Sequence, residues 1–289
     1  MESQGIRRKI VILGHSGFLG AGLYENFLKD SDFNTQGFSS AQIDLSLQES
    51  IPKLHNFVDR NTSVVMAASA LAKNKDFSSF RKEIDMFINL ADPNLISKIG
   101  HLIYVSSTAI YGRSSDSFIT ELSLPRPYNL YGLAKFIGEL IFKRACADHN
   151  VALTILRPGI IYGRGDVRSP LYRFIKNVHM RKDIEVFGDN STRLFLVYKT
   201  DLCRIVESIC GNFKTADYNI VSQENGVSLS ELTEAVFNVC GVRTGVKFRP
   251  DPGISLNLKF DMSKFKIDFS GFEFTKLENG INDYAILLN

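Results

Sequence analysis

A short apolar run that leads directly into a glycine-rich turn places the tightest limit on how this chain folds. Lys9–Leu13 (KIVIL) is apolar and β-branched, and the sequence GHSGFLG follows it at residues 14–20. An apolar run of this length, bounded by glycine, predicts a buried parallel strand rather than a helix. The GxxGxxG spacing then predicts a tight turn into a helix over about residues 19–28.

The same alternation continues to about residue 156. Further strands are predicted at 35–38, 63–68, 101–105 and 152–156, and helices at 47–57, 77–99 (with a break at Pro93) and 131–148. Strands that alternate with helices imply right-handed βαβ units. We therefore expect an α/β fold with a doubly wound, Rossmann-type parallel sheet, whose ligands bind beyond the carboxyl ends of the strands.

Beyond about residue 165 short strands and helices mix without a regular alternation. Strands are predicted at 184–187, 195–197 and 218–221, helices at 170–180, 201–210 and 229–240, and a loop at 249–258. We expect a dinucleotide-binding domain over 1–164, to which segments of about 195–222 return. The rest of 165–289 should form a smaller, mixed, substrate-binding lobe.

Composition excludes several classes of protein. The 289 residues include 34 basic and 31 acidic side chains, a net charge of +3 without a basic run, which argues against a nucleic-acid partner. No apolar stretch reaches the ~18 residues of a membrane span, and the N-terminus has no signal-peptide core. The four cysteines form no CxxC pair and the five histidines are scattered, so we expect a cytoplasmic protein with reduced thiols and no metal site.

The glycine turn predicts a dinucleotide site. Glycine lets the chain turn tightly and lets backbone amides approach a pyrophosphate, while the helix N-terminus adds partial positive charge. A glycine-rich turn without a ligand is the alternative. After the second strand the chain reads Phe38-Ser39-Ser40, with no carboxylate to bind the ribose hydroxyls of NAD. This favours NADP, because a 2′-phosphate would be tolerated there and the Ser39 hydroxyl would donate a hydrogen bond to it, with a positive charge supplied by Arg7 or Arg8. NAD is the alternative.

A tyrosine, a lysine and a serine-containing segment suggest oxidoreductase chemistry. Tyr131 and Lys135 (YGLAK) are four residues apart, so they share a helix face, and the lysine charge favours the tyrosinate form. Tyr131 can then exchange a proton with a carbonyl/alcohol pair. The segment VSSTAIYG, residues 105–112, supplies hydroxyls at the end of a predicted strand. An ordinary amphipathic helix and a polar strand exit are the structural alternatives.

These motifs together resemble the extended short-chain dehydrogenase/reductases that act on nucleotide sugars, the NAD-dependent epimerase/dehydratase family. The resemblance runs over nearly the whole chain. It includes SVVMAA at 63–68, LRP at 156–158, YGRG at 162–165, VFGD at 186–189, RLF at 193–195 and YNI at 218–220.

The resemblance implies roles for particular residues. Ser107 would be the catalytic hydroxyl (Ser106 or Thr108 in another strand register), Tyr131 the general acid/base and Lys135 the ribose-binding cation. The cofactor would lie against Gly14, Ser16, Gly17, Phe18, Leu19, Gly20, Ser39, Asp44, Leu45, Ala67 and Ala68. Thr108, Phe187 and Arg193 would contact a nucleotide-sugar substrate. Three of these residues have a purely structural alternative. Asp44 would be a helix cap or turn residue, Phe187 a buried ring and Arg193 a surface charge.

Departures from the family narrow the expected reaction. Thr108 and Ala109 stand where 4,6-dehydratases of the family have an Asp-Glu pair, and Ala109 stands where fucose-forming reductoisomerases have a cysteine. Hydride transfer alone remains, so an NADPH-dependent reductase of a 4-keto-6-deoxy sugar, in polysaccharide biosynthesis, is favoured. An NAD-dependent 4-epimerase and a catalytically silent NAD(P)-binding protein are the alternatives. Phe136, Ile137, Leu140 and Ile141 would form either a homodimer face or a face packed on the sheet.

Overall fold

The computed structural model describes residues 7–71, 76–112, 118–188, 192–249 and 258–285. Its backbone contacts divide the chain into two compact units. Unit 1 comprises Met1–Gly112, Pro125–Arg157 and Cys203–Tyr218; unit 2 comprises Arg113–Leu124, Pro158–Leu202 and Asn219–Asn289. The sequence predicted a dinucleotide-binding domain that ends at residue 164, whereas the corresponding segment of unit 1 ends seven residues earlier, at Arg157. The later segment predicted to rejoin that domain, about 195–222, is longer than the segment of unit 1 at Cys203–Tyr218.

Unit 1 is built on a six-stranded sheet with the strand order β11-β6-β4-β3-β1-β2. The strands are β1 (Arg8–Leu13), β2 (Phe33–Phe38), β3 (Thr62–Met66), β4 (His101–Val105), β6 (Ala152–Pro158) and β11 (Ala216–Ile220). β1 pairs in parallel with both β2 and β3, and β4 pairs in parallel with both β3 and β6. The doubly wound α/β fold predicted from the sequence is confirmed.

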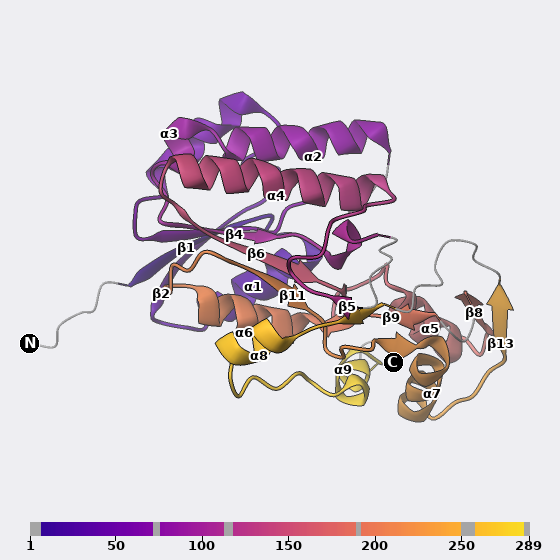
Figure 1. Cartoon of the computed structure of the whole chain (residues 1–289). Helices are drawn as coiled ribbons and strands as arrows, with labels where there is room; N and C mark the ends of the chain where they lie inside the picture. Colours follow the sequence, from indigo (N-terminus) through magenta and orange to yellow (C-terminus); the bar gives the residue numbers. More distant parts are fainter. Residues whose placement is uncertain (1–6, 72–75, 113–117, 189–191, 250–257, 286–289) are drawn as a thin grey trace, which may run out of the picture. The chain divides into compact units, whose positions relative to one another are not determined.

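Helices cover the sheet of unit 1. They are α1 (Phe18–Leu28), α2 (Phe77–Leu90), α3 (Pro93–Ile96), α4 (Leu130–Asp148), most of α6 (Lys199–Ile209) and the 3₁₀ helices η1 (Gln48–Asn56) and η2 (Thr108–Ile110). Figure 1 shows α2 and α4 side by side over one face of the sheet. Beneath them Phe87, Tyr104 and Phe142 meet edge to face, with ring centroids 5.0–5.5 Å apart. This aromatic cluster joins both helices to β4 and so fixes the element that carries residues 131–135.

Two predicted helices differ from the structure in a way that proline explains. The helix expected over 47–57 is the 3₁₀ helix η1, which contains Pro52 and so cannot form a regular α-helical ladder there. The helix expected over 77–99 is two helices, because Asp92 caps α3 through the Asn94 amide and Pro93 occupies its first turn.

Unit 2 is a mixed assembly of short strand pairs and helices. Its strands are β5 (Phe118–Ile119), β7 (Ile160–Tyr162), β8 (Ile184–Phe187), β9 (Arg193–Leu194), β10 (Leu196–Tyr198), β12 (Val227–Ser228), β13 (Val246–Arg249) and β14 (Lys259–Phe260). Its helices are α5 (Pro170–His179), α7 (Leu229–Cys240), α8 (Ser263–Asp268) and α9 (Leu277–Ala285). β9 and β12 pair antiparallel, whereas β8 and β13 pair in parallel. Most of the expected loop 249–258 lies outside the described residues.

The described part of the chain contains neither a helix that could span a membrane nor a group of side chains that could hold a metal ion. None of the helices there is both long enough and apolar enough to cross a bilayer. Among the same residues, no three His, Cys, Asp or Glu side chains are grouped so as to hold a metal ion.

Candidate functional site

The glycine turn between β1 and α1 is packed so closely that side chains are excluded from it. Gly14 has a φ of +88°, and a Cβ built on it would lie 2.7 Å from Ala68 Cα. A Cβ on Gly20 would lie 2.1 Å from the Gly14 carbonyl oxygen. The turn therefore closes both on the first turn of α1 and on the residues after β3, where Ala67 and Ala68 form its floor.

The start of α1 fits a pyrophosphate. Gly17 is the N-cap of the helix and supplies no side-chain hydrogen bond to it, whereas Asp, Asn or Ser side chains cap α2, α3, α4, α5 and α7. Ser16 and Gly17 are exposed, while Leu19 and Gly20 are buried beneath them. An exposed helix N-terminus without a side-chain cap favours an anion, so these residues suit the phosphates of a dinucleotide.

The end of β2 lies beside this turn. The Gly14 amide donates to the Phe38 carbonyl oxygen at 2.8 Å, so Ser39 follows directly beside the glycines. The Ser39 hydroxyl and amide both donate to Gln42 Oε1, at 2.9 and 2.8 Å. Ser39 would have to release Gln42 in order to donate to a ribose phosphate.

Asp44 and Leu45 have structural partners. Asp44 accepts hydrogen bonds from the Ser46 hydroxyl and amide, and its carboxylate lies 3.4 Å from Lys82 Nζ. Partial burial raises the pKa of Asp44, but these hydrogen bonds and the Lys82 charge outweigh it, and the net pKa is lowered. Leu45 is buried, and its carbonyl accepts from Asn89. Asp44 therefore serves as a turn residue, and its contact with adenine stays a prediction.

The suggestion that Arg7 or Arg8 reaches the cofactor is wrong. Arg8 begins β1 and is in register with Phe33, whereas the glycine turn follows Leu13 and Phe38 at the other end of the same pair. Five residues of strand separate these ends by about 16 Å. Arg8 instead donates to the Cys210 carbonyl.

His15, within the glycine turn, is a feature that the sequence analysis missed. A Cβ on Gly37 would lie 2.8 Å from His15 Cβ, so the second strand needs glycine there to admit the histidine. The imidazole packs edge-on against Tyr24, with centroids 5.0 Å apart. Its Nδ1 is buried and has no hydrogen-bond partner among the described residues.

Tyr131 and Lys135 are brought together at the start of α4. Asn129 caps the helix by accepting from the Gly132 amide at 2.8 Å. The Lys135 ammonium lies 5.7 Å from the centroid of the Tyr131 ring and 5.4 Å from that of Tyr104. Lys135 is only 4% exposed, and its Nζ lies 3.3 Å from the Glu83 carboxylate. The sequence analysis did not identify Glu83.

Ser107 lies on a turn that touches this helix. It is the N-cap of η2, where its hydroxyl accepts from the Ala109 amide at 3.1 Å, and Thr108 is the first residue of the same 3₁₀ helix. A Cβ on Gly132 would lie 2.4 Å from the Ala109 carbonyl oxygen, so η2 and α4 meet backbone to backbone. Ser106 is 1% exposed and donates to Glu139 at 2.6 Å. Because the Ser106 hydroxyl is buried and already bonded to Glu139, Ser107 is the better candidate for the catalytic hydroxyl.

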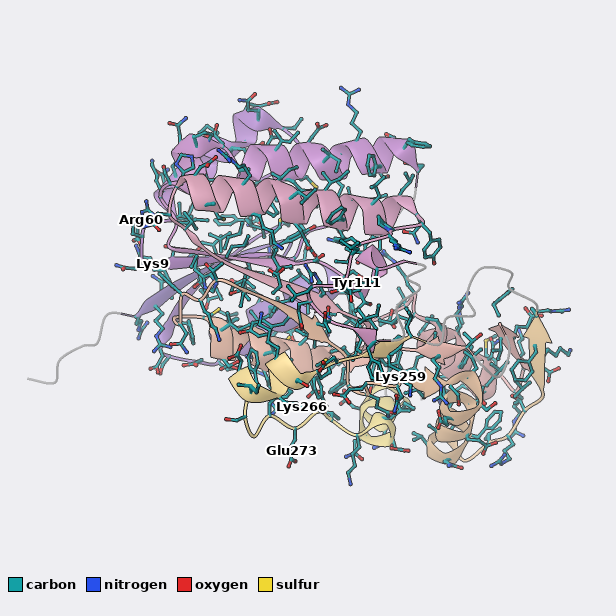
Figure 2. All side chains as sticks on the ribbon, viewed as in Figure 1. Lys9, Arg60, Tyr111, Lys259, Lys266 and Glu273 are labelled. Atoms are coloured by element: carbon teal, nitrogen blue, oxygen red, sulfur yellow. The ribbon has the colours of Figure 1, made fainter. Side chains whose placement is uncertain are left out.

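A buried network that sequence reasoning also missed lies behind these serines. Arg157 hydrogen-bonds both carboxylate oxygens of Glu139, and it donates to the Tyr111 hydroxyl at 2.9 Å. Tyr111, labelled in Figure 2, is fully buried and ends η2. Burial lowers the pKa of Arg157, but the hydrogen bonds and charge of Glu139 outweigh it, so its pKa is raised well above its usual range.

Two of the three residues predicted to contact substrate, Phe187 and Arg193, lie in unit 2, whereas Thr108 lies in unit 1. Phe187, at the end of β8, is 49% exposed rather than buried. It lines a depression of about 390 Å³ together with Tyr172, Arg173, Lys176 and Lys182. Arg193 on β9 lies 3.3 Å from the Glu231 carboxylate and donates to the Gly226 carbonyl.

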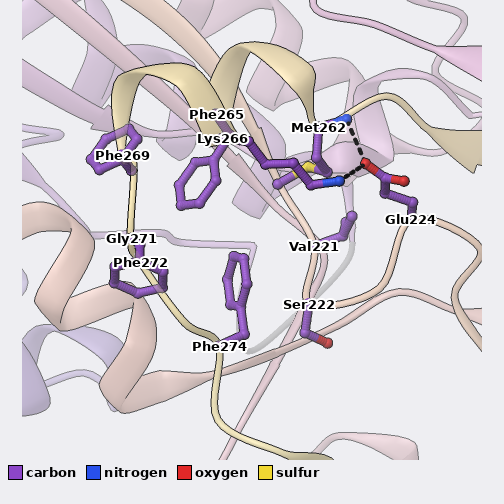
Figure 3. Close-up of a pocket in the computed structure, with 10 residues that line it drawn as sticks. All are labelled: Val221, Ser222, Glu224, Met262, Phe265, Lys266, Phe269, Gly271, Phe272 and Phe274. Carbon is purple, nitrogen blue, oxygen red and sulfur yellow. Dashed lines mark hydrogen bonds and ion pairs between the residues drawn. The ribbon is translucent and has the colours of Figure 1, made fainter.

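Unit 2 also contains an aromatic cavity of about 310 Å³ (Figure 3). Phe265, Phe269, Phe272 and Phe274 line it, and Lys266 donates to Glu224 at its edge. None of the predicted site residues lines this cavity, so its chemistry gives no support for the predicted reaction.

The profile of the NAD dependent epimerase/dehydratase family matches residues 10–221, which include the glycine turn, Ser107, Tyr131 and Lys135. The chain belongs to this family. The resemblance seen in the sequence is thereby confirmed, and dependence on NAD or NADP comes with it.

Curated relatives of this family member are distant and differ in their names. An uncharacterized protein, y4nG of Sinorhizobium fredii, is 28% identical over 264 residues, with 85% of this chain covering 64% of that protein. The uncharacterized UDP-glucose epimerase YtcB of Bacillus subtilis is 22% identical, over 96% of this chain and 98% of YtcB. A dTDP-4-dehydro-6-deoxy-D-allose reductase of Streptomyces bikiniensis is 26% identical, over 54% of this chain and 50% of the reductase.

Solved structures of the same family share the fold. A UDP-glucose 4-epimerase of Thermus thermophilus, in complex with NAD, superimposes with a TM-score of 0.79 at 18% identity, over 96% of this chain and 98% of the epimerase. A dTDP-glucose 4,6-dehydratase of Bacillus anthracis, also with NAD, gives 0.82 at 15% identity, over 96% and 95%. Enzymes of different reactions match equally well, so the fold alone does not select the reaction.

Proposed function

We propose that this protein is an NADPH-dependent reductase of a nucleotide-linked 4-keto-6-deoxy sugar. One arrangement carries the proposal. Tyr131 and Lys135 lie on α4, which contacts the η2 turn of Ser107, and the two residues after Ser107 are Thr108 and Ala109. This set can move a proton to or from one oxygen, but Thr108 and Ala109 offer no carboxylate or thiol for proton transfer at a sugar carbon. Dehydration and enol-based epimerisation are therefore disfavoured.

Each side chain has a separate task in the reduction. A dinucleotide held at the glycine turn would supply the hydride for the sugar ketone. Tyr131 donates its phenolic proton to the oxygen that becomes the alcohol, and the Ser107 hydroxyl holds that oxygen in place. The Lys135 ammonium stabilises the tyrosinate that remains. Positioned acid–base and hydrogen-bonding groups of this kind each contribute a factor of about 10²–10⁴ in rate.

The end of β2 supports NADPH as the reductant. Residues 39–43 (SSAQI) contain no carboxylate, so a 2′-phosphate beside Ser39 would meet no negative charge there. The nearest acidic residue along the chain, Asp44, is engaged with Ser46 and Lys82.

An NAD-dependent nucleotide-sugar 4-epimerase is the second candidate. The name of YtcB and the NAD-bound epimerase among the structural matches support it, since a 4-epimerase uses the same proton-transfer residues in both directions. A catalytically silent NAD(P)-binding protein is disfavoured because Ser107, Tyr131 and Lys135 are all present.

A nucleotide as the sugar carrier is supported by the depression beside Phe187. Its exposed ring offers a stacking surface, and Arg173, Lys176 and Lys182 place three cations around it. The proposal also includes contacts of Thr108 and Arg193 with the substrate. It further includes a cytoplasmic location and a homodimer. On α4, Leu140 is 52% exposed, whereas Ile141 packs against the core of unit 1, so only part of the expected dimer face is available.

Absorbance and titration of the purified protein test the proposal. We expect no reduced or oxidised nicotinamide to be retained after purification, tighter binding of NADPH than NADH, and NADPH consumption with a nucleotide-linked 4-keto-6-deoxy sugar. Tyr131→Phe should bind NADPH as before and lose turnover by at least about 10²-fold. Tightly retained NAD with interconversion of C4 epimers would instead support the epimerase. Wild-type binding of neither NADPH nor NADH would contradict both.

A further inference from the structure

A fully buried carboxylate faces the lysine of the proton-transfer pair from a neighbouring helix. Glu83 on α2 has no exposed surface, and its Oε1 lies 3.3 Å from the Nζ of Lys135, whose side chain is also buried. The rings of Phe87, Tyr104 and Tyr131 also lie near this ammonium, with centroids 5.4–5.9 Å from Nζ. A buried ammonium is costly without a counter-charge, and Glu83 supplies one.

The second oxygen of the same carboxylate holds the segment that follows β3. Glu83 Oε2 accepts hydrogen bonds from the Ser69 hydroxyl at 3.0 Å, from the Leu71 amide at 3.2 Å and from the Ala70 amide. These residues directly follow Ala67 and Ala68, the floor of the glycine turn. One side chain therefore connects Lys135 to the floor of the predicted cofactor site.

We propose that Glu83 is a positioning residue for the reaction: it fixes Lys135 beside Tyr131 and beneath the cofactor, and it compensates the charge of the buried ammonium. The inference rests on the proposed reduction at Tyr131. An uncompensated lysine would favour tyrosinate, which cannot donate a proton, whereas the Glu83–Lys135 pair is neutral as a whole. A reductase needs the protonated phenol in its resting state.

Other titratable groups around the pair do not substitute for Glu83. Tyr104 of β4 faces it, but burial and the charges of Glu83 and Glu139 raise its pKa well above the usual value, so it stays neutral. Glu139, one turn further along α4, is held by Arg157. On α2, Lys82 pairs with Asp44.

Three variants separate charge from structure. Glu83→Gln keeps an oxygen that can accept from Ser69–Leu71 but removes the charge. Glu83→Asp keeps the charge and shortens the side chain by one methylene. Asp85→Asn removes an exposed carboxylate of the same helix, whose side chain is 46% exposed and lies 4.0 Å from Arg81, and it leaves Glu83 and Lys135 unchanged. Thermal unfolding of each variant shows that it is folded before its function is compared.

Cofactor binding and the pH profile of turnover are the measurements. We expect Glu83→Gln to weaken NADPH binding several-fold, lower turnover by about tenfold or more, and move the high-pH loss of turnover to lower pH by on the order of one unit. Glu83→Asp should keep the wild-type pH profile, and Asp85→Asn should leave profile and affinity unchanged. A wild-type profile and affinity in Glu83→Gln would overturn the inference, as would a shifted profile in Glu83→Asp.

The two proposals fail in different ways. NADPH binding is measured without any sugar, so it tests the anchoring of Lys135 even if no keto sugar is reduced. A wild-type protein that binds NADPH, loses affinity in Glu83→Gln and reduces no keto sugar would contradict the proposed function and retain the positioning role.

Discussion

Arg157 holds the Glu139 carboxylate with two parallel hydrogen bonds, from Nε to Oε1 at 2.9 Å and from Nη2 to Oε2 at 2.7 Å. The two side chains are 4% and 2% exposed. The pair connects β6 to α4, and through the Ser106 and Tyr111 hydroxyls it also reaches both ends of the segment that contains Ser107. The position of the proposed catalytic serine relative to the tyrosine helix therefore depends on a buried ion pair.

Removal of one partner of this pair should destabilise the protein strongly. Glu139→Gln removes the charge of the fully buried partner and leaves Arg157 beside Asp217, which lies 3.0 Å away and is 21% exposed. We expect the free energy of unfolding to fall by about 3–5 kcal/mol in denaturant titrations, the usual cost of an uncompensated buried charge. Asp148→Asn is the matched control, because its pair with Arg144 is 43% and 82% exposed and should contribute less than about 1 kcal/mol. Equal effects of the two substitutions would contradict this account.

Gly132→Ala should disturb the site through the backbone. The added Cβ would lie 2.4 Å from the Ala109 carbonyl oxygen, so η2 and α4 must separate. We expect turnover to fall by about 10²-fold, since displacements near 1 Å have such effects, with smaller changes in NADPH affinity. Gly241→Ala, at a helix end with φ of +66° and no atom within 4 Å of the new Cβ, should cost about 1 kcal/mol of stability and leave turnover unchanged. Normal turnover in Gly132→Ala would rule out a role for this contact.

The sequence contained most of what was needed to predict the fold of unit 1. Apolar runs such as Lys9–Leu13 and His101–Val105 are buried strands in the structure, and GxxGxxG occupies the turn where its spacing places it. These signals are local, so they can be read from neighbouring residues. The 3₁₀ helix η1 was harder to predict because its hydrophobic spacing resembles that of an α-helix and only Pro52 shows the difference.

The polar partners in the site could not be predicted in the same way. Glu83 lies 52 residues from Lys135 and Glu139 lies 18 from Arg157, and each carboxylate sits on a helix where an acidic residue normally faces solvent. Their burial depends on how α2 and α4 pack on the sheet, which no local pattern encodes. The prediction that Arg8 lies near the cofactor failed for a related reason. Arg8 is close to the glycine turn in sequence, but the extended strand β1 places the two at opposite ends.

Ser39→Asp should reverse the preference for the cofactor. The carboxylate would lie beside the glycine turn, where it can accept from ribose hydroxyls and repels a 2′-phosphate. We expect NADPH binding to weaken by about tenfold to a hundredfold and NADH binding to tighten, measured by titration of nucleotide fluorescence. Asn34→Asp places the same charge near the amino end of the same strand and should change neither affinity. Tight NADPH binding by Ser39→Asp would show that the 2′ position lies elsewhere.

His101 is a buried base whose charging opposes folding. It is fully buried, and its Nε2 lies 2.8 Å from Thr154 Oγ1. Thr154 uses its single proton to donate to the Lys214 carbonyl, so Nε2 must be the donor and Nδ1 carries no proton. Nδ1 has no hydrogen-bond partner among the described residues, and burial lowers the pKa of His101 to about 4.

Acid should therefore destabilise the protein through this side chain before most carboxylates are protonated. Because the pKa is lowered on folding, the full stability is present above the unfolded value of about 6.5 and is lost as the pH falls from there towards 4, by about 3 kcal/mol in all. Denaturant titrations at pH 7.5 and pH 5 should show a decrease in wild type that exceeds that of His101→Gln by about 2 kcal/mol. His55→Gln, which removes a partly exposed histidine beside Lys98, should keep the wild-type decrease. An equal pH dependence in wild type and His101→Gln would show that His101 does not titrate between the two states.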